Sequence, residues 1–195
     1  MPRIGMERAL DRLTEAAVRL FQERGYASVS VDEIVSSAGV TKGTFYYYLS
    51  SKAELLYRIH DKFISRELDE GERILALEES PVVKLRMLVR SLIRSIHDYL
   101  PYVTVFFNEM RHLEEPFYGR IREKRDRYAA MFEATIREAV DRGEFRADLD
   151  PKLATLALFG MCNWMYRWYR PDGPLSDAEI AERFLSILLR GMEAR

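Results

Sequence analysis

The sequence has few of the residues that most active sites are built from. It contains one cysteine, Cys162, and three histidines, His60, His97 and His112, in 195 residues. A single thiol cannot form an internal disulfide, and histidines so far apart lack the spacing of metal ligands. A glycine-rich phosphate loop and a nucleophile elbow are also missing. We therefore expect no enzyme activity, metal or cofactor, and expect Cys162 to be a small buried residue of a cytoplasmic protein.

An excess of charge of one sign is lacking as well. The 30 Lys and Arg residues are balanced by 31 Asp and Glu residues, so the formal net charge is −1. The chain as a whole is therefore not a basic nucleic-acid binder, and DNA binding would need a local cluster. No stretch reaches the ~18 uncharged apolar residues of a membrane span. The N-terminal MPRIGMERAL has no apolar core segment like that of a signal peptide, so we expect no membrane partner.

What the sequence does contain is helical periodicity. Strand-like alternation is absent, and the 10 glycines and 7 prolines fall at breaks between apolar stripes. We predict an all-α chain with an N-terminal three-helix domain, residues 1–52, and a C-terminal six-helix domain, residues 53–195. The predicted helices cover about residues 6–24, 30–37, 41–49, 51–77, 80–100, 102–112, 117–142, 150–169 and 176–192.

The most informative stretch is 25–52, GYASVSVDEIVSSAGVTKGTFYYYLSSK. Ser30 and Glu33 form a capping box, Gly39 gives free access to positive φ for a sharp turn, and Thr41 caps a second short helix. This pattern predicts a helix-turn-helix, whose second helix enters a major groove with its first residues at base edges. Taken alone, it fits DNA binding and ordinary packing of two helices about equally well.

The same stretch resembles the DNA-binding signature of the TetR family of transcription regulators. Two positions depart from that signature: Leu49, where the family usually has Phe, and Tyr48, where His is common. The resemblance implies a TetR-like fold, in which a helix-turn-helix domain precedes an effector-binding and dimerisation domain. It also implies a cytoplasmic repressor that binds double-stranded operator DNA. The matching residues are Leu20, Phe21, Gly25, Tyr26, Ser30, Val31, Ile34, Ala38, Gly39, Val40, Lys42, Gly43, Thr44, Phe45, Tyr46, Lys52 and Leu55.

The residues expected to touch DNA lie at the starts of these helices and on the outward side of the second. Lys42 and nearby N–H groups would meet phosphate, and Lys52, in the first turn of the long fourth helix, would hold another phosphate. The alternative for Lys52 is a solvated lysine. The full expected set is Ser30, Thr41, Lys42, Gly43, Thr44, Tyr46, Tyr47, Tyr48 and Lys52.

Aromatic and thioether side chains concentrate in the middle of the chain. For any single one of them, ordinary core packing is the better explanation. Together they suggest a ligand pocket between helices, since large rings leave gaps, and the resemblance implies a small-molecule effector. The expected lining is Tyr102, Phe106, Phe107, Met110, Tyr128, Met131 and Phe132.

A second candidate effector site lies near the end of the eighth predicted helix. Helical spacing places Asn163, Arg167 and Arg170 on one face, beside Trp164 and Trp168. Guanidinium groups next to indoles suit an anion attached to a flat ring, such as a nucleotide. The alternative is two solvated arginines at a helix C-terminus, where cations are favoured.

The run 157–172 resembles TetR-type regulators of fatty-acid and aromatic-acid degradation, several of which respond to acyl-CoA thioesters. The resemblance implies an acyl chain in the aromatic pocket and CoA phosphates on the arginines. Two alternatives stay open. One is a multidrug-type sensor with a promiscuous apolar pocket and no CoA site, and the other is an enzyme with a vestigial helix-turn-helix.

The last two long helices carry apolar stripes that are too wide for two helices to bury alone. Pairing with a second copy would give a four-helix interface and two recognition helices for two half-sites. We therefore expect a homodimer. Its predicted interface residues are Leu156, Gly160, Ile180, Phe184, Ile187 and Leu188.

Overall fold

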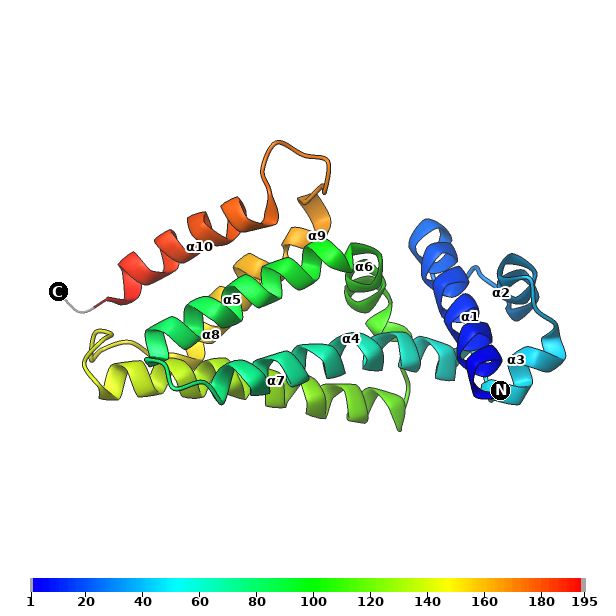
Figure 1. Ribbon diagram of the computed structural model, residues 1–195, viewed down its shortest axis with the longest axis horizontal. Helices are drawn as coiled ribbons and strands as arrows, with labels where there is room; N and C mark the ends of the chain where they lie inside the picture. Colours follow the sequence, from blue (N-terminus) through cyan, green and yellow to red (C-terminus); the bar gives the residue numbers. More distant parts are fainter. Residues whose placement is uncertain (1, 194–195) are drawn as a thin grey trace. The chain divides into compact units, whose positions relative to one another are not determined.

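The computed structural model describes the backbone of residues 2–193 and the side chains of residues 9–193, and this part of the chain is helical (Figure 1). It has ten α-helices and one 3-10 turn, which confirms the predicted all-α class. In order they are α1 (Pro2–Arg24), α2 (Val31–Ala38), α3 (Lys42–Tyr48), α4 (Lys52–Leu75), α5 (Pro81–Asp98), α6 (Leu100–Glu109), η1 (Met110–His112), α7 (Phe117–Asp141), α8 (Pro151–Asn163), α9 (Met165–Trp168) and α10 (Asp177–Met192).

The helices form two compact units. The first unit ends at Ile64 and takes in Pro101–Arg122, and the second combines Ser65–Leu100 with the chain from Glu123 onward. Helices α4 and α7 each contribute residues to both units. This division describes packing alone, and the functional boundary that we predicted after residue 52 stays a prediction. Among residues 2–193, none of the helices combines the length and the apolar character that crossing a membrane requires.

The turn between α2 and α3 has the local structure that its sequence predicts. The Ser30 hydroxyl accepts the Glu33 N–H, and the Glu33 carboxylate accepts the Ser30 N–H, which completes the capping box. Gly39 has a φ of 61°, and the next N–H, that of Val40, donates to the Val35 carbonyl at 3.0 Å. A left-handed residue followed by such a return bond ends a helix sharply.

Gly39 is fixed by a neighbour as well as by its own φ. The guanidinium of Arg12, on α1, donates to the Gly39 carbonyl at 2.9 Å. A Cβ at position 39 would lie 2.6 Å from that guanidinium nitrogen, closer than van der Waals contact allows. The turn therefore favours glycine for its backbone conformation, and a larger residue there would also displace the end of the Arg12 side chain.

Pro101 does not end the fifth helix as we predicted. Helix α5 already ends at Asp98, and α6 begins at Leu100 with Pro101 in its first turn. The first-turn N–H groups of a helix have no partner within that helix, so a proline there loses nothing. The break belongs to Tyr99, whose φ and ψ of −126° and 28° are not helical.

In the second unit, α5, α8 and α10 pack against one another. Leu88 and Leu92 of α5, Leu158 of α8 and Leu185 of α10 are buried. Cys162 is buried among them, and burial raises the pKa of its thiol to about 12. The thiol is therefore protonated and unreactive, which confirms the prediction of a small buried residue.

Candidate nucleic-acid interface and effector site

Helix α3 presents one face to solvent because its other face is anchored. Phe45 is fully buried, Leu49 directly after the helix is buried too, and α3 contacts both α1 and α2. At its start the Thr41 hydroxyl accepts the Thr44 N–H at 3.0 Å. The opposite face carries Tyr47, which is 75% exposed, so the helix offers hydroxyl and phenol groups outward.

The residues expected to touch DNA divide by their exposure. Thr44 and Tyr48 are half-buried, whereas the others on or beside α3 are exposed, as is Ser30 at the start of α2. Lys42 already has a partner, the Asp32 carboxylate at 2.9 Å, and both side chains are more than half exposed. An exposed ion pair of this kind contributes little to stability, so Lys42 could exchange the Asp32 carboxylate for a DNA phosphate.

Lys52 has a structural task that its sequence context did not reveal. Its ammonium group donates to the carbonyls of Tyr26 and Val29 at 2.9 and 2.7 Å, and it lies 4.1 Å from the centre of the Tyr26 ring. Burial lowers the pKa of this lysine. An ammonium group has three N–H donors, so one at most remains for a phosphate. Lys52 thus holds the loop that leads into α2, and its contact with DNA stays a prediction.

The aromatic residues expected to line an effector pocket fall in both compact units. In the first unit, Phe106 is buried against His60 and Phe63, with ring centres 5.0 and 5.2 Å away. Tyr102, Phe107 and Met110 are half-buried. Because Phe106 is packed so closely against other rings, it fits the alternative interpretation, in which it is an ordinary residue of the core.

In the second unit, the rings of Tyr128 and Phe132 lie 5.2 Å apart, and both are buried. Phe159 of α8 packs on both rings, at 5.9 and 4.8 Å. Met131 is half-buried beside them. The contribution of this cluster to an effector pocket stays a prediction.

The helical face predicted through Asn163, Arg167 and Arg170 is wrong, because the helix is interrupted. Helix α8 ends at Asn163, and the Arg167 N–H bonds to the Trp164 carbonyl, three residues back, at the start of the short α9. Arg170 lies beyond α9 and directly before Pro171. A residue before proline is disfavoured in helical conformation, so Arg170 cannot continue the α9 face.

The aromatic and cationic groups of this segment nevertheless lie close together. The Arg167 guanidinium lies 5.7 Å from the centre of the Trp164 ring and 5.6 Å from that of Tyr166. Trp164 is 57% exposed. Trp168 is exposed too and lies 6.4 Å, centre to centre, from Phe184 of α10. The segment therefore forms an open aromatic surface with a guanidinium group in it.

The apolar stripes of α8 and α10 divide between inside and outside. Ile180 was expected at a dimer interface, but it is 2% exposed and packs inward with Ala181 and Leu185. It falls on the helical face that covers α5, which corrects the prediction for this residue. Leu156 and Ile187 are exposed, the latter by 63%. Gly160 is exposed as well, while Phe184 and Leu188 are half-buried.

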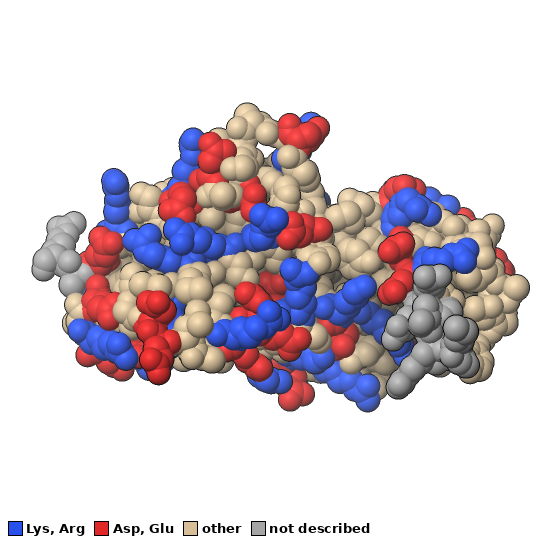
Figure 2. All heavy atoms as spheres, viewed as in Figure 1, with Lys and Arg blue, Asp and Glu red and all other residues tan. Residues whose placement is uncertain are grey.

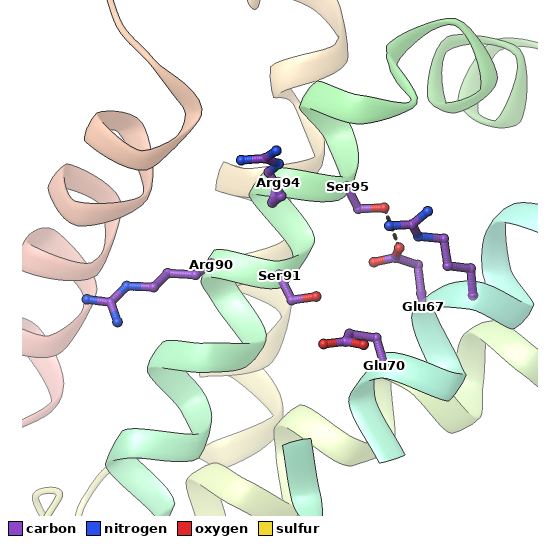
Figure 3. A pocket seen from close by; sticks show the side chains of 7 residues that line it. Glu67, Glu70, Arg90, Ser91, Arg94 and Ser95 are labelled. Atoms are coloured by element: carbon purple, nitrogen blue, oxygen red, sulfur yellow. Dashed lines mark hydrogen bonds between the residues drawn. The ribbon is translucent and has the colours of Figure 1, made fainter. Parts of the chain in front are cut away.

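Sequence reasoning missed Glu67, which is 3% exposed on α4. Its carboxylate accepts the hydroxyl hydrogen of Ser95 on α5 (Figure 3) and that of Tyr128 on α7. Burial raises the pKa of this carboxyl to about 7, against the opposing effect of both hydrogen bonds. The available signal was an acidic residue next to Leu68 on the apolar stripe of the fourth helix.

Two sequence profiles of known families match the chain. The profile of bacterial regulatory proteins, tetR family, matches residues 13–59. The profile of the tetracyclin repressor-like C-terminal domain matches residues 78–192. The two matches fall on the segment that holds the helix-turn-helix and on the segment that holds most of the second unit.

Individual relatives match over nearly their whole length. The HTH-type transcriptional repressor KstR2 of Mycolicibacterium smegmatis is 27% identical, over 93% of this chain and 89% of its own. The fatty acid metabolism regulator protein of Bacillus subtilis is 24% identical, over 93% and 94%. The crystal structure of AibR in complex with isovaleryl coenzyme A and operator DNA matches with a TM-score of 0.84 and 26% identity, over 93% of this chain and 98% of that one.

The buried carboxyl of Glu67 makes stability depend on pH. Its pKa in the folded state is above that of an unfolded carboxyl, so the folded state binds more protons and stability falls as pH rises toward 7. We expect Glu67→Gln, which cannot ionise, to be more stable than the wild type at pH 8 by up to about 3 kcal/mol. The gain should shrink at pH 5.

Urea unfolding at pH 5, 6.5 and 8 measures this difference between the variant and the wild type. Asp69→Asn, at an exposed position two residues away on α4, is the matched control and should follow the wild type. A Glu67→Gln profile parallel to that of the wild type would show that Glu67 has an ordinary pKa.

Proposed function

This chain belongs to the TetR family of bacterial transcription regulators, and from that membership we propose that it represses transcription and is released from its operator by an acyl-CoA thioester. The family consists of DNA-binding regulators and not of enzymes. The observation that carries the proposal is α3, whose buried Phe45 directs a polar and aromatic face outward. We place the protein in the cytoplasm, where bacterial operator DNA lies.

We assign the contacts on DNA by the chemistry of the outward groups. Thr44 and Tyr47 offer hydroxyl groups and a ring to base edges in the major groove, which is the part of the duplex that carries sequence information. Lys42 exchanges its exposed pair with Asp32 for a phosphate, which positions the helix without reading sequence. Ser30, Thr41, Gly43 and Lys52 lie at helix starts and would contact the DNA backbone, whereas Tyr46 and Tyr48 would make their contacts from the second half of α3.

We propose a homodimer built on the outer faces of α8 and α10. Leu156 and Ile187 are exposed apolar side chains on those faces, and Gly160 leaves room because a Cβ there would meet no atom within 4 Å. A second copy that presents the same two helices would cover all of them in a four-helix interface. The dimer would then carry two copies of α3 for two half-sites.

We propose the surface around Arg167 as the place where the effector's polar end binds. AibR, a relative across the whole chain, binds isovaleryl coenzyme A, and this supports an acyl-CoA thioester here. Arg167 supplies a charge for phosphate between two rings, and exposed Trp164 supplies a flat surface for adenine. Arg170 adds a second cation just beyond α9, and the aromatic clusters would take the acyl part.

The link between effector and DNA is proposed to be α4. This helix is continuous from Lys52 to Leu75, and three residues separate its start from the end of α3. A ligand that changes the direction of α4 would therefore change the setting of α3. Release from DNA requires that the ligand bind the DNA-free arrangement more tightly, and the difference in affinity sets the limit of the effect.

The assignment of DNA contacts is tested on an operator selected from genomic fragments. We expect Thr44→Ala and Tyr47→Ala to weaken operator binding by ~1–3 kcal/mol with little change on random duplexes, because they remove base contacts. Lys42→Ala should weaken both, and its affinity should fall less steeply with salt, by about one unit of slope. Arg137→Ala on α7 is the control. Variants that all bind like the wild type would remove α3 from the interface.

The proposed dimer is tested by light scattering. Ile187→Glu changes an exposed side chain, so the monomer should fold, but it places a charge in the interface at a cost of several kcal/mol. We expect this variant to be a helical monomer at concentrations where the wild type is a dimer. Arg137→Glu places a glutamate elsewhere and should stay dimeric. A monomeric wild type at micromolar concentration would refute the interface.

The effector is tested by titrating the protein–operator complex with acyl-CoAs, the matching free acids and cationic dyes. We expect acyl-CoAs to release the operator and free acids to act poorly, since they lack the phosphates. Arg167→Ala should raise the acyl-CoA concentration needed for release by about tenfold or more, because a charge-assisted hydrogen bond is worth ~1.5–3 kcal/mol. Its DNA affinity without effector should not change, and Arg137→Ala should behave like the wild type. Release by dyes, with no effect of Arg167→Ala, would instead identify a multidrug-type sensor.

A further inference from the structure

A polar cavity lies between α4 and α5, within the second compact unit. Its volume is about 370 Å³. Helix α4 contributes Arg66, Glu67 and Glu70 to its walls. Helix α5 contributes Arg90, Ser91, Arg94 and Ser95. Figure 3 shows Glu67 and Glu70 extending from α4 toward Ser91 and Ser95 on α5. Because each of these lining side chains is polar, the cavity does not suit an acyl chain.

The arginines of this cavity are held by contacts that a ligand can replace. Arg90 pairs with Glu182 at 2.7 Å, and Arg94 pairs with Asp98 at 3.1 Å, with the arginine side chains more than half exposed. Arg66 donates to the Tyr99 hydroxyl and lies over its ring. Exposed ion pairs contribute little, whereas a phosphate or carboxylate can accept two parallel guanidinium bonds.

A second hollow adjoins the first and shares two of its residues. It measures about 190 Å³ and lies between α5 and the start of α10, with Arg90 and Arg94 in its wall. Arg90 and Arg94 therefore line both the cavity between α4 and α5 and the hollow between α5 and α10. Figure 2 shows Lys and Arg side chains gathered in a band across this face, beside α10.

We propose that the cavity between α4 and α5 binds the phosphate or carboxylate group of a small polar ligand on Arg66 and Arg94, and that the ligand binds together with a proton on Glu67. Ser91 supplies a hydroxyl donor to the same group. When Glu67 is protonated, Glu70 is the one remaining carboxylate among the lining residues, whereas Arg90 and Arg94 pair with Glu182 and Asp98 outside that lining. The cavity uses none of the residues that we propose around Arg167 for the polar end of the effector. Its ligand is a separate small anion or the phosphate end of a CoA ester, and in the second case the cavity replaces the Arg167 surface as the place for that end.

The groups around Glu67 explain why ligand binding would be coupled to the uptake of a proton. On its own helix these are Arg66 and Glu70, α5 adds the Ser95 hydroxyl beside Arg90 and Arg94, and α7 adds Tyr128. Because burial raises the pKa of Glu67 to about 7, this carboxyl is half ionised at neutral pH. An anion bound nearby favours the neutral carboxyl and raises its pKa further. Binding therefore takes up a proton, and affinity falls as pH rises above 7.

The ligand would act on the contacts that hold α4 in place. The carboxylate of Glu67 joins α4 to α5 through Ser95 and to α7 through Tyr128. A protonated carboxyl has one acceptor fewer and becomes a donor, so these bonds rearrange when the ligand binds. The site is thus placed to change the packing of the helix that follows α3 in the chain.

Isothermal titration calorimetry of the full-length, DNA-free protein tests the site at pH 6 and pH 8. One probe is adenosine 3′,5′-bisphosphate, the phosphate end of CoA, and the other is citrate, a free small anion. We expect binding by one of them, about tenfold tighter at pH 6 than at pH 8. Two buffers with different ionisation heats should show proton uptake. Binding by the bisphosphate alone assigns the CoA end, and binding by citrate assigns a separate anion.

Four variants locate the binding. Arg94→Gln should weaken it tenfold or more, whereas Arg86→Gln removes the same charge from α5 outside the cavity walls and should leave it unchanged. Ser91→Leu should fill the cavity and abolish binding. Glu67→Gln should still bind but lose the pH dependence.

Two results would overturn the proposal. One is that neither probe binds at millimolar concentration, and the other is that Ser91→Leu binds like the wild type. Because no operator is present, these results are independent of whether acyl-CoA releases the protein from DNA.

Discussion

Burial of Phe45 determines what α3 can do. A helix of seven residues has almost no stability alone, so its position depends on the side chain that it inserts against α1 and α2. Once Phe45 is inside, helical geometry leaves no choice for its neighbours, and Tyr46 and Tyr47 must face solvent. The N-cap at Thr41 then determines where α3 begins, and the left-handed Gly39 at the end of α2 determines the direction of the chain that leads to it.

The loop before α2 is held in place by a residue of α4. The Tyr26 carbonyl accepts the Val29 N–H at 3.3 Å, and the Lys52 ammonium group donates to the carbonyls of both residues. Lys52 belongs to the first turn of α4, so the same residue joins the start of the helix-turn-helix to the helix that follows it. A lysine that we expected to hold phosphate is therefore part of the scaffold that positions the residues proposed to contact DNA.

The sequence predicted best those features that are decided within a few residues. The capping box at Ser30, the left-handed Gly39 and the cap at Thr41 each depend on neighbours within four positions, and all occur as predicted. Ile180 was assigned to the wrong surface of α10. The apolar stripe of this helix is wide, and the sequence pattern does not indicate which of its residues pack on α5 and which stay exposed. Glu67 was missed because its partners, Ser95 and Tyr128, lie far along the chain.

Because the chain has a formal net charge of only −1, discrimination between DNA sequences depends on a few contacts with the bases. Non-specific affinity comes from cations that release counterions from phosphate, and here Arg24 and Lys42 are paired with Glu33 and Asp32. Such a surface holds random DNA weakly, which leaves base contacts with a large share of the operator affinity. One short helix offers few base contacts, so a second copy of α3 on the same duplex is the remaining source of affinity. Weak attraction to phosphate and the exposed apolar faces of α8 and α10 therefore both support the dimer that we propose, which would read two half-sites.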